Sequence, residues 1–390
     1  MSNARMVRLL VLGNGAAGAE KQAFAFGERL RRKLLDPSLV CSRFKVVCPP
    51  VECVRVALGS FRCVPPTLQL LGAHMTRNPF FGYQKQDVRP LRSMSKDSVH
   101  ALDIVIGCGR STVALCAMMK QRQPATTFNV QIQHPRVPLA LFDAVIAPRH
   151  DFPRGKRHAR NVFLTSGSIH DITPKSLPRR GRNWSDEFDT KLRGRRTRIV
   201  WLLGGPCRGF PFTEQDAEAM VDQFVRGLPC DDDVAVLVTF SRRTPPFVQK
   251  LVRRRLTARF PVPGHLLVYE GTERPNPYTA LLATASCIVI TPDSISMTTE
   301  AIASRKPVFI LGVEMCKGKF ARFHEFLFES KATAPFTAAA LHRREAWAPS
   351  GASVAFEHEI TVIVNTIARD IHQVLEQRDG RANKTTRRFM

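Results

Sequence analysis

Five apolar segments in the second half of the chain, each followed by a stretch with helical periodicity, constrain the fold more than any other feature. They occupy residues 198–205, 233–240, 265–270, 287–292 and 307–312. The stretch after the first segment opens with Thr213 and Asp216, which have the spacing of a helix-capping box. Because successive strand–helix units return each strand in the same direction, the pattern predicts a parallel sheet covered by helices on both faces.

The first part of the chain shows the same alternation, from a predicted strand at residues 6–12 to a last one near residue 165. The predicted fold class is therefore α/β, with two doubly wound Rossmann-like domains that face a cleft, and a C-terminal closing helix. The predicted parts are an N-terminal Rossmann-like domain at 1–170, a basic linker at 171–197, a C-terminal Rossmann-like domain of the nucleotide-binding type at 198–345, and the closing helix at 355–378.

A glycine-rich turn follows the first predicted strand. Gly13, Gly15 and Gly18 have the spacing of the dinucleotide-binding fingerprint. That fingerprint needs an acidic residue at the end of the second strand, where this chain has Cys48 and Pro49. The sequence therefore argues against a nicotinamide or flavin cofactor, and no cofactor is predicted. Two interpretations of the turn stay open: a tight turn without a ligand, and a cleft loop whose amides attract an anion.

Polar residues follow the strands of the second half, at ends that meet at one edge of a parallel sheet. They are Gly204, Gly205, Ser241, Arg242, Arg243, Asp293, Ser294, Ser296 and Glu300. Glycine amides and arginines suit a diphosphate, a helix N-terminus at Ser294 suits its negative charge, and Glu300 suits ribose hydroxyls. The alternative is that Asp293 and Ser294 only cap the helix and that Glu300 is solvated. The set predicts a nucleotide-binding pocket.

The first half offers a second set after its strands, formed by His134, Arg136, His150 and Asp151. His134 and Arg136 are predicted to face the cleft. His150 and Asp151 are candidate catalytic residues, because either can act as a general base, although either can equally form an ordinary salt bridge. No metal site is predicted, since the cysteines form no C-x-x-C pair and the histidines are not at ligand spacing.

The chain is strongly basic, with 58 Lys and Arg against 33 Asp and Glu and a net charge of +25. Such a surface attracts anionic membranes and acidic protein segments. No RNA-binding motif or finger accompanies the charge, so no specific nucleic-acid partner is predicted. The first strand begins almost at Met1, which leaves no room for a signal peptide, and no segment reaches the roughly 18 apolar residues of a membrane span. A cytosolic location is expected.

Several blocks carry a family resemblance, in order over residues 12–330. They include "GNGAAGAEKQAFAFGERL", "VQIQHPRVPLALFDAVIAPRHD", "GGPCRGFPFTEQDAEAM" and, most specific, "DSISMTTE". They resemble the mitochondrial fission family whose plant founder is called "elongated mitochondria". The resemblance implies a glycosyltransferase-B-like fold and, as in the plant member, a cytosolic protein on the mitochondrial outer surface that brings a dynamin-related GTPase to fission sites. It also implies Asp293, Ser294, Ser296 and Glu300 as the pocket.

Ala16 and Arg305 depart from the residues common at these positions in the family. These departures affect the ligand chemistry more than the fold. Two functions from different classes remain at this point. One is a non-catalytic adaptor in mitochondrial fission, held by its basic surface. The other is a metal-independent glycosyltransferase that uses a nucleotide sugar.

Overall fold

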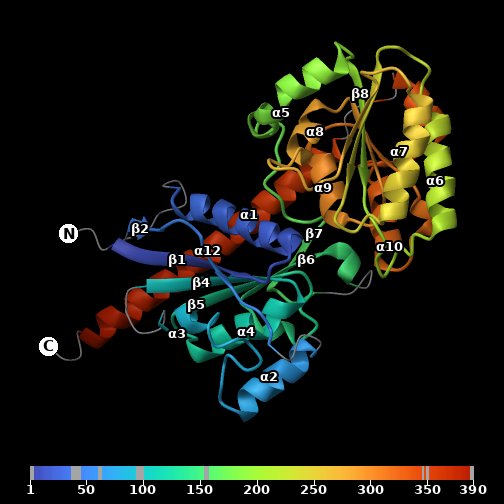
Figure 1. Cartoon of the computed structure of the whole chain (residues 1–390). Helices are drawn as coiled ribbons and strands as arrows, with labels where there is room; N and C mark the ends of the chain where they lie inside the picture. Colours follow the sequence, from blue (N-terminus) through green and yellow to red (C-terminus); the bar gives the residue numbers. More distant parts are fainter. Residues whose placement is uncertain are drawn as a thin grey trace. The chain divides into compact units, whose positions relative to one another are not determined.

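The chain folds into two compact units in a computed structural model. Unit 1 consists of residues 1–170 together with 358–390, and unit 2 consists of residues 171–357. The structure describes residues 4–36, 45–59, 64–93, 101–152, 158–344, 347 and 351–386. The chain thus leaves unit 1, forms the whole of unit 2, and returns to unit 1 in its last helix (Figure 1).

Unit 1 is built on a parallel sheet. Its strands are β1 (Ala4–Gly13), β2 (Lys45–Val47), β3 (Glu52–Arg55), β4 (Ala101–Cys108), β5 (Thr127–Ile132), β6 (Ala144–Pro148) and β7 (Val162–Thr165). Their order is β2-β1-β4-β5-β6-β7, and β3 pairs with the second half of β1, beyond β2. Leu9 and Val11 enter one core and Leu10 and Leu12 the other, because successive side chains of a strand point to opposite faces.

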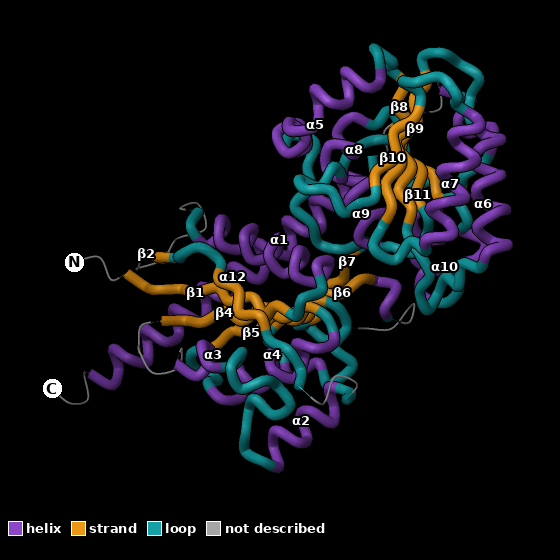
Figure 2. The backbone as a smooth tube through the Cα atoms, in the orientation of Figure 1, coloured by secondary structure: helices purple, strands orange, loops and turns teal. Residues whose placement is uncertain are grey.

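Helices cover both faces of this sheet (Figure 2). They are α1 (Ala17–Leu34), α2 (Pro66–Met75), α3 (Arg89–Ser93), α4 (Val113–Arg122) and α12 (Ala352–Thr386). Helices α1 and α12 share one core, where Phe26 and Leu30 meet the stripe of Ile363, Ile367 and Ile371. Helices α2 and α4 lie over the other face. The predicted C-terminal helix is therefore an integral layer of unit 1.

Unit 2 has the strand order of a classical Rossmann sheet. Its strands are β8 (Thr197–Leu203), β9 (Val234–Phe240), β10 (Leu266–Tyr269), β11 (Cys287–Ile290), β12 (Val308–Ile310) and β13 (Ala334–Pro335). All pairings are parallel in the order β10-β9-β8-β11-β12-β13. The order reverses between β8 and β11, the point where such sheets bind ligands beyond the carboxyl ends of their strands. The α/β class with two doubly wound sheets is confirmed.

The helices of unit 2 also form two layers. They are α5 (Leu177–Leu192), α6 (Glu214–Gly227), α7 (Pro246–Arg259), α8 (Tyr278–Thr284), α9 (Ile295–Ala303), α10 (Lys319–Glu329) and α11 (Ala338–His342). Helices α6 and α7 cover one face of the sheet, and α5, α8 and α9 cover the other (Figure 1). Helix α6 begins with the predicted capping box, in which Thr213 accepts from the Asp216 amide and Asp216 accepts from the Thr213 amide.

The prediction of a linker without regular secondary structure at residues 171–197 is wrong. Helix α5 fills most of it and buries Leu177, Trp184, Phe188 and Leu192 in a core of unit 2. Trp184, Phe188 and Leu192 recur four positions apart, and Leu177 lies seven positions before Trp184, which places all four on one helical face. Charged residues of both signs separate them, so the stripe is thin. Burial of this sparse stripe is what holds the segment in a helix.

Candidate functional site

The candidate site lies at the carboxyl edge of the unit 2 sheet, where the strand order reverses. Gly204 and Gly205 follow β8, and Thr291 and Asp293 follow β11. A β-carbon on Gly204 would lie 1.8 Å from Oδ1 of Asp293, and one on Gly205 would lie 2.0 Å from the carbonyl oxygen of Arg243. Both positions therefore need glycine, because neighbouring groups approach the backbone too closely for any side chain.

Asp293 is the centre of this site. Its carboxylate is fully buried and accepts hydrogen bonds from Thr291 Oγ1 at 2.7 Å and from the Gly205 amide at 3.1 Å. Arg243 Nη2 lies 2.5 Å from Oδ2 and forms an ion pair in which the carboxylate is buried and the guanidinium is partly exposed. Burial raises the pKa of Asp293, and Arg243, Thr291 and Gly205 oppose that rise. The carboxylate thus has a partner on each oxygen and already uses the amide of Gly205.

The loop after β9 supports the same turn. Thr244 Oγ1 donates to the carbonyl of Gly204, with the two oxygens 2.6 Å apart, and Ser241 Oγ accepts from the Arg243 amide at 3.2 Å. Ser241 and Arg243 therefore stabilise the loop itself. Arg242 is exposed at the tip of the turn, and in the described part of the chain its side chain makes no hydrogen bond or ion pair.

The start of helix α9 carries the remaining predicted residues. Ser294 Oγ accepts from the Met297 amide at 3.3 Å and so caps the helix, while Ser296 is half-buried. Glu300 is buried rather than solvated. Burial, followed by the charge and hydrogen bond of Glu300, raises the pKa of Tyr278 well above its usual value. Glu300 thus interacts with Tyr278 of α8, a contact that sequence reasoning missed.

His324 is a second residue that sequence reasoning missed. It is fully buried in α10, and its Nε2 atom lies 2.8 Å from the carbonyl oxygen of Pro292, to which it donates. Its Nδ1 atom is buried and has no hydrogen-bond partner among the described residues. Burial lowers the pKa of His324 to about 4, so the ring is neutral at physiological pH. His324 therefore anchors the loop that carries Asp293 without adding charge.

The glycine turn of unit 1 has a comparable arrangement. Gly13 ends β1, Gly15 has a φ of 75°, and Gly18 lies in the first turn of α1. The Glu20 carboxylate accepts from the Gly15 amide at 2.8 Å and pairs with Arg55 Nη2 at 3.1 Å. Burial acts to raise the pKa of Glu20, but Gly15 and Arg55 hold it below its usual value. Glu20 is part of the glycine-rich segment, yet its role was not predicted.

The other residues predicted in the first half lie beyond β5 and β6. His134 Nδ1 accepts from the Arg136 amide at 3.1 Å, and the His134 ring packs on Phe152 with centroids 4.7 Å apart. Burial and Arg136 lower the pKa of His134, whereas Asp151 acts to raise it. The charge of Asp151 thus acts on the His134 ring. Of the two candidate bases, Asp151 is half-buried and His150 is buried. No group of His, Cys, Asp or Glu among the described residues is arranged to hold a metal ion.

The comparison with known families decides what kind of protein has this site. Residues 17–355 match the model of the family described as "Mitochondrial fission ELM1". This chain belongs to that family. The resemblance drawn from the sequence blocks is confirmed.

Two relatives of this ELM1-family protein show how far the similarity extends. The "Mitochondrial fission protein ELM1" of Arabidopsis thaliana is 32% identical over 253 residues, which is 60% of this chain and 57% of the plant protein. The uncharacterised protein RP120 of Rickettsia prowazekii is 28% identical over 273 residues, which is 63% of this chain and 75% of that protein. The aligned region is less than two thirds of the plant relative.

Solved structures with a similar backbone come from several bacteria and a yeast. A trehalose-6-phosphate phosphatase N-terminal domain from Candida albicans has a TM-score of 0.49 at 10% identity, covering 97% of both chains. MnaA of S. aureus, solved with UDP, has a TM-score of 0.48 at 14% identity, covering 94% of this chain and 97% of its own. Similarity at this level assigns neither a ligand nor a reaction to the ELM1-family chain.

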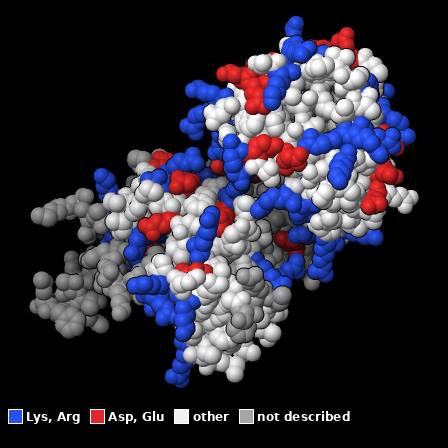
Figure 3. Space-filling view, viewed as in Figure 1, with Lys and Arg blue, Asp and Glu red and all other residues white. Residues whose placement is uncertain are grey.

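Charges of both signs are mixed on the face of this family member that Figure 3 draws. On the face drawn in Figure 3, Lys and Arg side chains lie on both units with Asp and Glu among them. Several basic residues are paired, such as Arg255 with Asp222 at 3.1 Å and Arg198 with Asp189 at 2.6 Å. Residues 154–160 are rich in Arg and Lys, and of these, residues 154–157 lie outside the described part of the chain. None of the described helices is both long and apolar enough to cross a membrane.

Proposed function

We propose that this ELM1-family protein is a binding adaptor rather than an enzyme. In this proposal it is a cytosolic protein that lies on an anionic mitochondrial outer surface and recruits a dynamin-related GTPase. The observation that carries the proposal is shared by both units. In each unit, a carboxylate of the chain itself accepts a hydrogen bond from the glycine turn that follows the first strand. In unit 1 this carboxylate is Glu20, which pairs with Arg55. In unit 2 it is Asp293, which pairs with Arg243.

These carboxylates act against binding of a phosphate at the two turns. The amides of Gly15 and Gly205 would donate to an incoming phosphate, but each already donates to a carboxylate. A phosphate would have to displace that carboxylate or lie beside a like charge. Separating Asp293 from the partly exposed Arg243 leaves a fully buried carboxylate without its charged partner, which costs about 1 to 3 kcal/mol. Binding through an external surface needs no such displacement.

Rescue of mitochondrial shape in cells that lack the protein tests the proposal. The surface variant Lys250→Glu with Arg254→Glu reverses two exposed charges one turn apart on α7, neither of which forms an ion pair among the described residues. The matched variant His150→Ala with Asp151→Ala removes both candidate bases. We expect the base variant to restore fission and GTPase recruitment and the surface variant to fail, because reversed charges repel an anionic surface.

The opposite outcome, rescue by the surface variant and failure of the base variant, would refute the adaptor. Circular dichroism of both variants shows whether each keeps the wild-type fold. The amount of GTPase retained on purified mitochondria is then measured with the wild type, the surface variant and the base variant. This measurement separates loss of recruitment from loss of stability.

A second function, metal-independent glycosyl transfer from a nucleotide sugar, is favoured by the strand order of unit 2. The reversal between β8 and β11 is where sheets of this type bind nucleotides, and Arg242 is exposed beside the Gly204–Gly205 turn. If a nucleoside diphosphate binds there, Arg242→Ala weakens it by about 1.5 to 3 kcal/mol in titration calorimetry, the range for a hydrogen bond to a charged group. Absence of binding by uridine, adenosine and guanosine diphosphates and their sugars would remove this function.

A further inference from the structure

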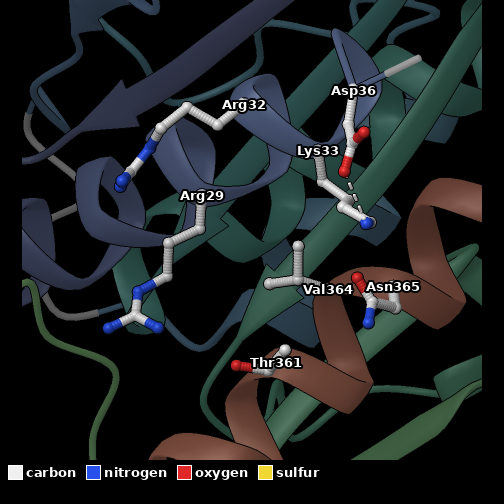
Figure 4. A pocket seen from close by; sticks show the side chains of 7 residues that line it. All are labelled: Arg29, Arg32, Lys33, Asp36, Thr361, Val364 and Asn365. Carbon is white, nitrogen blue, oxygen red and sulfur yellow. Dashed lines mark hydrogen bonds and ion pairs between the residues drawn. The ribbon is translucent and has the colours of Figure 1, made fainter. Parts of the chain in front are cut away.

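A pocket of about 240 Å³ opens in unit 1 between the last turns of α1 and the first half of α12. It is lined by Arg29, Arg32, Lys33, Asp36, Thr361, Val364 and Asn365. Figure 4 shows that the basic side chains come from α1, that Thr361, Val364 and Asn365 come from α12, and that Val364 lies between the two groups. The pocket therefore has a basic wall, a neutral polar wall and a small apolar floor.

The basic wall is held in place by hydrogen bonds. Arg29 Nη2 donates to the carbonyl oxygen of His170 at 3.0 Å, Arg32 Nε donates to the carbonyl of Glu28 at 3.2 Å, and Lys33 Nζ lies 2.9 Å from the Asp36 carboxylate. The lining contains three cationic side chains and one carboxylate, so positive charge is in excess. This excess outweighs the partial negative charge at the C-terminal end of α1.

The opposite wall adds neutral polar groups. Thr361 and Asn365 are four residues apart on α12, so their side chains lie one above the other on the same helical face. A hydroxyl and an amide can donate to an anion without adding charge. Val364 is buried and belongs to the core that α1 and α12 share, which fixes the distance between the two walls.

The pocket is separate from the glycine turn of unit 1. Helix α1 begins just after the carboxyl end of β1 and runs back along the sheet, so its last turns lie at the opposite edge from Gly13 and Gly15 (Figure 1). A ligand at the pocket therefore does not compete with Glu20, and none of the residues that line the pocket belongs to unit 2.

We propose that this pocket binds a phosphoryl group. Arginine and lysine are the side chains that proteins use for phosphate, and the Asn365 amide on the opposite wall offers a further donor. The volume is below the roughly 300 to 1,000 Å³ of pockets that enclose whole drug-sized ligands, so it suits a headgroup rather than a whole nucleotide sugar. The phosphoryl group can belong to a phospholipid headgroup or to a small soluble phosphate ester. A phosphoryl site at this pocket is compatible with the adaptor and with the transferase alike.

The experiment uses the full chain and two kinds of probe. Titration calorimetry with inorganic phosphate and glycerol 3-phosphate measures soluble ligands, and co-flotation with phosphatidylcholine vesicles with and without phosphatidic acid measures a lipid headgroup. The pocket variants are Arg32→Ala, which removes an exposed cation, and Asn365→Asp, which adds a negative charge with little change of shape. The matched control is Lys21→Ala, which removes an exposed cation of the same helix outside the pocket.

We expect at least one probe to bind the wild type, with affinity reduced about tenfold in each pocket variant, as for loss of one hydrogen bond to a charged group. The control is expected to match the wild type. Binding of soluble phosphates alone identifies a small ester as the ligand, and binding of phosphatidic acid vesicles alone identifies a lipid. The proposal is overturned if no probe binds, or if Lys21→Ala weakens binding as much as Arg32→Ala does.

Discussion

The buried His324 makes the stability of unit 2 depend on pH. Its ring is neutral in the folded protein because burial lowers its pKa from 6.5 to about 4. In the unfolded chain the ring regains a pKa near 6.5, so the unfolded state binds the extra proton first as the pH falls. Stability is therefore fully present above pH 6.5 and is lost progressively as the pH drops from there towards about 4.

The size of the effect follows from the gap between the two values. A difference of about 2.5 pH units, at 1.36 kcal/mol for each, corresponds to about 3 kcal/mol in total. Between about pH 7 and about pH 5 we expect a loss of about 2 kcal/mol in the free energy of unfolding from this residue. His324→Gln removes the titration and leaves an amide that can donate to Pro292, so this part of the pH dependence disappears in the variant.

The three tryptophans make the measurement specific to one unit. Trp184, Trp201 and Trp347 all lie in residues 171–357, so tryptophan fluorescence in urea follows the unfolding of unit 2. The quantity to compare is the change in unfolding free energy between about pH 7 and about pH 5 in wild type and variant, which cancels contributions of the other histidines. An equal change in wild type and variant would refute the reasoning. It would mean that His324 has the same pKa in the folded and in the unfolded chain.

Three further predictions concern the site and the corrected helix. Gly204→Ala is expected to lower the free energy of unfolding of unit 2 by about 1 to 3 kcal/mol in urea, because its β-carbon overlaps Asp293; an unchanged midpoint would contradict this. Asp293→Asn is expected to cost about 1 to 3 kcal/mol by the same assay, since Arg243 loses its charged partner but is partly exposed. Trp184→Ala is expected to cost about 3 to 5 kcal/mol and to open α5 to trypsin, and continued resistance of α5 would contradict its docking through this residue.

Much of the fold could be predicted from the sequence because its signals are local. Each predicted strand of the second half is a dense apolar run, and the capping box before α6 involves residues three apart. Strand β13 could not be predicted in this way. It consists of Ala334 and Pro335 alone, and only their pairing with β12 makes them a strand. Helix α5 was missed because its apolar stripe is thin and charged residues of both signs occupy much of the helix.

The candidate site could be predicted only in part. The sequence placed Gly204, Gly205, Arg243 and Asp293 at one sheet edge, because parallel strands bring their carboxyl ends together. It could not show that Asp293 itself closes the glycine turn, since that contact joins residues 88 apart in the chain. Nor could the sequence show that Glu20 accepts from the Gly15 amide and pairs with Arg55. The role of a carboxylate near a glycine turn depends on where its side chain points.

The return of the chain to unit 1 through α12 affects the order in which the protein forms on the ribosome. Residues 1–170 emerge first, but the face of their sheet that carries Leu9 and Val11 is completed by Ile363, Ile367 and Ile371, which are translated only after unit 2. Domains tend to fold as soon as their residues have emerged. Unit 2 can therefore become native while that face of unit 1 still exposes apolar surface, so the nascent chain needs protection there until α12 arrives.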